Sequence, residues 1–342
     1  MLIKSLVAAA LLASVTAAPA VAQQRTLSVQ AGAAWTHVQT GVTLPATLIG
    51  IPRDAVTDNS AKEIDVAAAY GNGAATTVTL YVFRPALTSV PVWFDRSETQ
   101  ILLRDIYANP TAPAPVAAFA PPRSAAASGL RRIYVPGRGP YKSTGLAMMP
   151  LGDWLVVVRI SSQQLDAAAL DAKLSEVIAA LGWPDRVADT LAAAPVAPCA
   201  TPLAYAKNAK LKAPDMTDAL LGATLATIQP DPKEVAKATP VTWCREGEAT
   251  SQYGVYRANG DATGYSIAMG DAGAAISVWP ALDLGKGKPG YQLSLGLLDR
   301  TLIFPSFDKL PAPAAAVSAV TSNNPISSTE RGSKNIVITT GK

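Results

Sequence analysis

Histidine, cysteine and net charge are all scarce in this sequence, and each scarcity argues against a class of function. The chain has one histidine, His37, and two cysteines, Cys199 and Cys244. Proton-transfer sites and zinc sites draw heavily on histidine and thiolate groups, so a histidine-based triad and a zinc centre are both disfavoured. A formal net charge of +4 is too small to predict binding to nucleic acid or to an anionic membrane. We therefore expect no catalytic residue, no metal and no cofactor.

Long apolar runs are also missing, except at the N-terminus. Lys4, the apolar stretch 6–15 and the small residues before Gln23 are typical of a secretory signal peptide. The run is well short of the roughly 20 residues that a membrane-spanning helix needs, so it does not predict a permanent anchor. We expect a signal peptide over 1–22, cleavage after Ala22, and a soluble chain that is periplasmic or secreted.

The two cysteines are the whole thiol inventory of a chain that we expect to be exported. In an oxidising compartment such a pair usually forms a disulfide. Their separation is too long for a redox-active C-x-x-C motif, and further zinc ligands are lacking. The sequence thus predicts a Cys199–Cys244 disulfide, which stabilises the fold by about 4 kcal/mol in the chain-entropy model.

Segments rich in alanine and proline divide the chain. A length well above that of most single cores favours two domains. The composition changes predict five parts. These are a signal peptide over 1–22, an N-terminal α+β domain over 23–190, an Ala/Pro linker over 191–198, a C-terminal mainly β domain over 199–310, and a low-complexity tail over 311–342, in which 335–340 favours an edge strand.

The N-terminal domain mixes strand and helix patterns. Alternating apolar residues on both sides of Gly71-Asn72-Gly73 predict a β-hairpin. A helix follows over 90–107, with Asp95 and Arg96 on its outer face. The proline-rich stretch that comes next predicts an exposed loop, and Ser161 or Ser162 is expected to cap a second helix. The predicted elements are strands 66–70 and 76–84, helix 90–107, loop 109–128, strands 130–135, 141–149 and 154–160, the last of them central, and a helix carrying Leu170 to Leu181.

The C-terminal domain is mostly strand. Two helices are expected at its start, over 216–228 and from Asp231 and Pro232. Short glycine-containing turns then separate six strands, as in an antiparallel sheet. These strands are 241–246, 253–257, 265–269, 275–279, 292–297 and 302–307. The fold class is therefore α+β, with two domains that are each a mainly antiparallel sheet with packed helices.

Several motifs match catalytic or ligand-binding patterns only formally. Ser306 and Lys309 satisfy S-x-x-K, but a strand rather than a helix surrounds them. The segment 285–290 satisfies G-x-G-x-x-G without the helix that would hold a phosphate. Glu246 and Glu248 lie on one side of a strand, where like charges are commonplace. Carboxylates between 54 and 65 lack the spacing of a calcium loop and indicate a solvated turn.

Aromatic residues of the second sheet are the best candidates for a binding surface, because they can stack on a sugar or a peptide. Core packing explains most residues of this kind equally well. The candidates are Trp243, Tyr253, Tyr256, Tyr265, Trp279 and Tyr291.

Several short segments resemble those of a known group of proteins. The segments are Trp35-Thr36-His37, Thr40-Gly41, Leu44-Pro45, Tyr81-Val82-Phe83-Arg84-Pro85 and Trp93-Phe94-Asp95-Arg96. In these segments, mainly in the first domain, the chain resembles uncharacterised exported proteins of sphingomonad-type alphaproteobacteria. The resemblance implies export but no activity.

Three functions remain open from the sequence. The first is a non-catalytic periplasmic or envelope module that binds an unknown envelope protein or a cell-wall component, without nucleic acid. The second is a hydrolase that works without histidine, through carboxylates or a Ser/Lys pair. The third is a structural or chaperone-like subunit that assembles through sheet edges. We place the first ahead because two sheets with long connectors require no active site.

Overall fold

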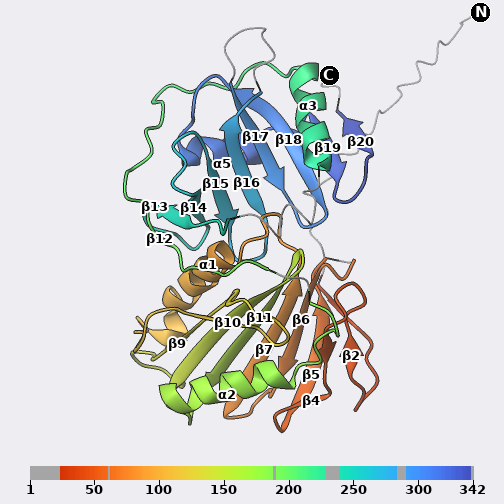
Figure 1. Cartoon of the computed structure of the whole chain (residues 1–342), viewed down its shortest axis with the longest axis vertical. Coiled ribbons are helices and arrows are strands. Elements are labelled where there is room, and N and C mark those ends of the chain that lie inside the picture. Colours follow the sequence, from red (N-terminus) through yellow and green to blue (C-terminus); the bar gives the residue numbers. More distant parts are fainter. Residues whose placement is uncertain (1–23, 61, 188–189, 229–238, 283–289, 340–342) are drawn as a thin grey trace, which may run out of the picture.

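The described part of the chain forms two large, mainly antiparallel β-sheets, each with its own helices, and one small two-stranded sheet (Figure 1). The structure is a computed structural model that describes residues 24–60, 62–187, 190–228, 239–282 and 290–339. It confirms the α+β class with mainly antiparallel sheets. The expected signal peptide, the helix from Asp231 and most of the segment 285–290 lie outside the described residues.

The first sheet has the strand order β1-β5-β6-β7-β11-β10-β9-β8, with β4 paired to β5. A separate two-stranded sheet is formed by β2 and β3. The strands are β1 (Arg25–Thr26), β2 (Trp35–Thr36), β3 (Thr43–Leu44), β4 (Thr47–Leu48), β5 (Ile51–Asp58), β6 (Asp65–Tyr70), β7 (Thr76–Phe83), β8 (Ala117–Phe119), β9 (Gly129–Tyr134), β10 (Ser143–Leu151) and β11 (Trp154–Ser162).

Two helices cover opposite faces of this sheet, which explains why β11 is apolar on both sides. Val156, Val158 and Ile160 pack with α2 (Ala167–Ala180), whereas Leu155 and Val157 pack with α1 (Val90–Leu102). β11 lies between β7 and β10, so its predicted central place is confirmed. A short 3-10 helix, η1 (Asp105–Tyr107), extends α1.

The second sheet runs in the order β12 to β20 without a crossover, and only β12 is parallel to its neighbour. In Figure 1, α3 (Met216–Thr227) and α5 (Pro313–Ser322) lie on opposite faces of it. The strands are β12 (Ala197–Pro198), β13 (Trp243–Glu246), β14 (Tyr253–Ala258), β15 (Tyr265–Met269), β16 (Ala275–Pro280), β17 (Tyr291–Gly296), β18 (Arg300–Phe307), β19 (Ser327–Glu330) and β20 (Ile336–Ile338).

Helix α1 joins the two sheets. Its Trp93 and Phe94 share one apolar cluster with Tyr256, Ala268 and Ala275 of the second sheet. Arg96 is fully buried and donates to the carbonyl oxygens of Gly270 at 2.7 Å, Thr250 at 2.9 Å and Ser251 at 3.2 Å. The prediction that Asp95 and Arg96 point outward is therefore wrong, because both sides of α1 face protein.

Several other local predictions also need correction. The segment 311–342 is not a tail: it supplies α5, β19 and β20, and its Ala316 and Ala319 are buried. The loop 109–128 contains β8, which pairs with β9. Asp166, not a serine, caps α2 by accepting from the N–H of Ala169. In the first two cases a tertiary partner stabilises a segment whose local pattern is weak, whereas the cap of α2 is a local contact.

The carboxylates between 54 and 65 do not form a solvated turn. Asp58 lies on β5 and is fully buried, and it accepts from the N–H groups of Ser60 and Glu63 and from the side chain of Arg25. These contacts outweigh the effect of burial and hold the pKa of Asp58 below its usual value. Its role is to fix the β5–β6 connection.

Candidate binding face of the second sheet

A row of serines crosses the face of the second sheet that α1 and α3 cover only in part. Ser266, Ser277 and Ser294 are direct cross-strand partners on β15, β16 and β17. The row continues to Tyr256 at one end and to Ile303 at the other. Among the described residues the three hydroxyl groups have no hydrogen-bond partner, and Ser277 and Ser294 are partly exposed.

Two tryptophans lie in the neighbouring row. Trp243 pairs with Ala258, and Trp279 pairs with Gln292. Continuing the strand register by two residues brings Ala258 opposite Gly264, and Gly264 opposite Trp279. A Cβ at Gly264 would meet the Trp279 ring at 2.4 Å, so the indole lies across the glycine backbone. The row thus places two partly exposed indoles on either side of two small residues.

The face carries little charge. Arg245 supplies the one guanidinium group in these two rows. It lies opposite Tyr256 and donates to a carboxylate oxygen of Asp95 on α1 at 2.6 Å. Tyr256 donates to the other oxygen of Asp95, also at 2.6 Å. Burial and the neighbouring carboxylate raise the pKa of Tyr256, so it stays a neutral donor. A neutral, polar face flanked by indoles remains.

The six aromatic candidates do not form one surface. Only Trp243, Trp279 and Tyr256 share the serine-bearing face, and Tyr256 is fully buried beneath α1. The side chains of the other three point to the opposite face of the sheet, where they belong to the apolar cluster on the α5 side. Tyr265 is fully buried there and donates to the carbonyl oxygen of Pro311 at 2.8 Å. These three are Tyr253, Tyr265 and Tyr291.

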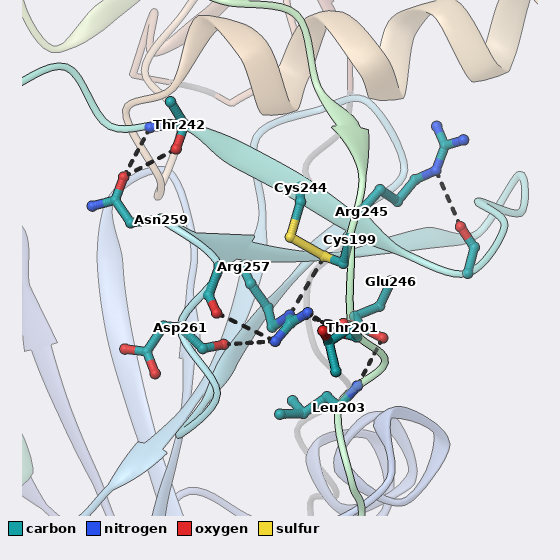
Figure 2. The surroundings of a disulfide bond; sticks show 12 residues. Cys199, Thr201, Leu203, Thr242, Cys244, Arg245, Glu246, Arg257, Asn259 and Asp261 are labelled. Carbon is teal, nitrogen blue, oxygen red and sulfur yellow. Dashed lines mark hydrogen bonds and ion pairs between the residues drawn. A yellow bond between two sulfur atoms is a disulfide. The ribbon is translucent and has the colours of Figure 1, made fainter.

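The predicted disulfide is present. Cys199 and Cys244 are joined between the segment that follows β12 and strand β13 (Figure 2). Next to it, Arg257 is almost fully buried: its Nε lies 2.7 Å from Glu246 Oε1, and its guanidinium donates to the carbonyl oxygens of Thr201 and Asp261. Arg257 thus ties the incoming chain to the sheet, and Glu246 is its counter-ion rather than half of a carboxylate pair with the exposed Glu248.

Two hollows lie away from the serine-bearing face. One, of about 430 Å³, adjoins the disulfide and is lined by prolines, Tyr205 and the ion-paired Arg245 and Glu246. The other, of about 640 Å³, adjoins β5, and its Arg53 donates to the carbonyl oxygens of Ala33 and Leu44. Arg245 and Glu246 are neutralised by ion pairs, whereas Arg53 has neutral carbonyl partners. The exposed Asp54, which also lines the second hollow, accepts only from the N–H of Asn72 among the described residues.

The remaining residues that the sequence suggested as possible catalytic groups make hydrogen bonds to other residues of the protein. His37 is fully buried, with Nε2 2.7 Å from the carbonyl oxygen of Glu63 and Nδ1 2.8 Å from the Thr40 hydroxyl. Burial lowers the pKa of His37, so the ring is neutral. Ser306 bonds to Asp218 while Lys309 bonds to Asn208, so the S-x-x-K residues do not act on each other.

The serine row and Gly264 were missed from the sequence, although a signal for the serines exists. Each serine is the one polar residue between apolar neighbours, as in Tyr265-Ser266-Ile267, Ile276-Ser277-Val278 and Leu293-Ser294-Leu295. Period-two alternation therefore puts all three on the non-core face. Only the strand register, which the sequence does not fix, aligns them in one row.

Comparison of this chain with protein-family models, with curated proteins and with solved structures finds no match. None of the helices in the described residues is long and apolar enough to cross a membrane.

Proposed function

We propose that this protein is a non-catalytic binding module of the cell envelope, exported by its N-terminal segment, and that it holds a neutral glycan on the serine-bearing face of the second sheet. The observation that carries the proposal is the row in which Trp243 and Trp279 lie on either side of Ala258 and Gly264. The disulfide between Cys199 and Cys244 is compatible with an extracytoplasmic location.

The chemistry of the face favours a sugar over other ligands. Indole rings offer a flat apolar surface to the C–H groups of a pyranose, and Gly264 lets the partly exposed Trp279 indole lie flat against β15. Hydroxyls of Ser277 and Ser294 and the amide of Gln292 can exchange hydrogen bonds with sugar hydroxyls. Among the described residues of these two rows, the pairing of Arg245 with Asp95 leaves no free charge for an ionic ligand.

The test is binding of the mature protein to a soluble N-acetylglucosamine hexasaccharide, measured by calorimetry, and to insoluble peptidoglycan sacculi, measured by co-sedimentation. We expect Trp279→Ala to weaken binding at least about tenfold, or about 1.4 kcal/mol. The double variant with Trp243→Ala should abolish it. Tyr291→Ala is the matched control because it removes an aromatic side chain from the opposite face of the same sheet.

Two outcomes would overturn the proposal. One is the absence of binding to either glycan by the folded wild-type protein. The other is equal binding by the wild-type protein and the double tryptophan variant, which would place any glycan site elsewhere. Circular dichroism of each variant establishes that it is folded before its binding is compared.

A further inference from the structure

Arg159 is a partly buried charged group that makes no side-chain hydrogen bond or ion pair among the described residues. It lies on β11 opposite Thr79 and Leu146, and alternation along the strand turns it away from Val158 and Ile160, which pack against α2. Its side chain is therefore on the α1 side of the first sheet. Its Nη2 atom is buried without a hydrogen-bond partner, and no ion pair of Arg159 is found among the described residues.

Glu98, a carboxylate on this side of the sheet, is already engaged. Glu98 of α1 accepts from Arg132 at 2.8 Å and from the hydroxyl of Tyr134 at 3.0 Å, both through Oε1. Arg131, one residue before Arg132, points to the other face and bonds to Ser175 of α2 at 2.8 Å. Within the described ranges the positive charge of Arg159 thus has no ion-pair partner, an arrangement that is costly for a partly buried guanidinium.

Hydroxyl groups gather beside Arg159. Ser161 lies two residues along on the same face of β11, and its Oγ is 2.8 Å from the Oγ1 of Thr144 and 3.2 Å from the hydroxyl of Tyr107. Burial alone would raise the pKa of Tyr107. The hydrogen bonds from Ser161 and Thr144 and the positive charges of Arg159 and Arg104 outweigh burial, so this pKa lies below its usual value.

We propose that Arg159 and the hydroxyl of Tyr107 form a binding site for a small oxyanion, phosphate or carboxylate, on the α1 side of the first sheet. An oxyanion at the partly exposed side of the Arg159 guanidinium supplies the missing counter-charge. Arg104, exposed at the end of α1, adds a second positive charge beside Tyr107. The site is independent of the glycan-binding face, because it belongs to the other sheet.

The first test is thermal unfolding of the full mature protein with inorganic phosphate, sulfate or acetate, each exchanged for chloride at constant ionic strength. A ligand that binds only the folded state raises the melting temperature in a saturable way. We expect at least one of these oxyanions to do so for the wild-type protein. Comparison of phosphate and sulfate with acetate distinguishes a tetrahedral from a planar ligand.

Substitutions locate the site. Arg159→Gln should weaken binding of the effective oxyanion by about 10- to 100-fold, as expected for the loss of hydrogen bonds from a charged donor. Arg159→Lys keeps the charge without the two-pronged geometry and should bind with intermediate strength. Arg123→Gln is the matched control, since Arg123 is an exposed arginine of the same domain whose partner, Asp185, is fully exposed.

A spectroscopic readout separates a binding role from a purely structural one. A bound oxyanion places negative charge beside Tyr107 and should raise the pKa of this phenol, visible in the tyrosinate absorbance of wild-type protein minus Tyr107→Phe. If Arg159→Gln fails to fold, the affinity of Arg159→Lys and the pH titration of Tyr107 in the wild-type protein still test the proposal. Two results would overturn the proposal: no response of the wild-type protein to any of the three oxyanions, or equal affinity in the wild-type protein and the position-159 variants.

Discussion

The contact of Arg96 with the second domain makes a strong prediction about folding. Replacing Arg96 with methionine keeps much of the side-chain volume but removes three hydrogen bonds and leaves the carbonyl oxygens of Thr250, Ser251 and Gly270 without that donor. Desolvation of the guanidinium offsets part of what these bonds contribute. Hydrogen bonds from a charged donor contribute about 1.5 to 3 kcal/mol each, and because water can reach part of these carbonyl groups and guanidinium desolvation is recovered, we expect a net loss of about 3 kcal/mol.

Urea unfolding followed in parallel by tryptophan fluorescence and circular dichroism measures the effect. We expect the wild-type protein to unfold with coincident transitions, because α1 belongs to the packing of both sheets. Arg96→Met should lower the midpoint and separate the transitions of the two domains. Arg123→Gln, at an exposed ion pair, should stay within about 0.5 kcal/mol of wild type. If Arg96→Met loses less than about 1 kcal/mol and still unfolds in one step, Arg96 does not couple the domains.

Three further predictions concern stability. Replacing both Cys199 and Cys244 with serine should lower the unfolding free energy by up to about 4 kcal/mol, and an unchanged urea midpoint would contradict this. Burial, with nearby Asp58 and Asp271, raises the pKa of Asp65 from 3.8 to about 6. The folded state therefore binds this proton more tightly, and its contribution to stability falls as the pH rises from 3.8 to about 6. Asp65→Asn should flatten this pH dependence and raise stability at neutral pH by about 1 to 3 kcal/mol, whereas an unaltered profile would exclude that role. Gly264→Ala should push the Trp279 indole off β15, which should lower the unfolding free energy by about 1 to 3 kcal/mol and shift the tryptophan emission. Unchanged emission and stability would show that the indole does not lie against Gly264.

The elements of the fold were largely predictable because their patterns are local. Alternation in 76–83 and the apolar run in 154–162 indicate β7 and β11, and the predicted central place of β11 follows from its two apolar faces. The disulfide followed from the cysteine count alone. Segments such as 313–322 were missed because α5 is alanine-rich and is held by packing against β16 and β17.

The candidate site was less predictable because it depends on contacts between distant residues. The tyrosines at 253, 265 and 291 cannot be assigned to a face from composition, since one residue of register exchanges the two faces. Asp95 and Arg96 look like the polar side of an ordinary surface helix, and only the second sheet makes that side buried. A charged residue whose hydrogen-bond partners lie far away in the sequence leaves no signal in the local sequence pattern.

The position of α1 has a consequence for the order in which the chain can complete its structure. Asp95 precedes Arg245 by 150 residues and Tyr256 by 161, and Arg96 precedes its first carbonyl partner by 154. During synthesis the first sheet can therefore form well before the groups that satisfy its helix have been made. Until the residues of the second sheet are synthesised, the side of α1 that later packs against them is exposed to water, proteases and chaperones. A truncation anywhere between residues 184 and 242 keeps the whole first sheet and α2 but should leave a half-protein that is soluble only with help, so the two sheets must persist or be degraded together.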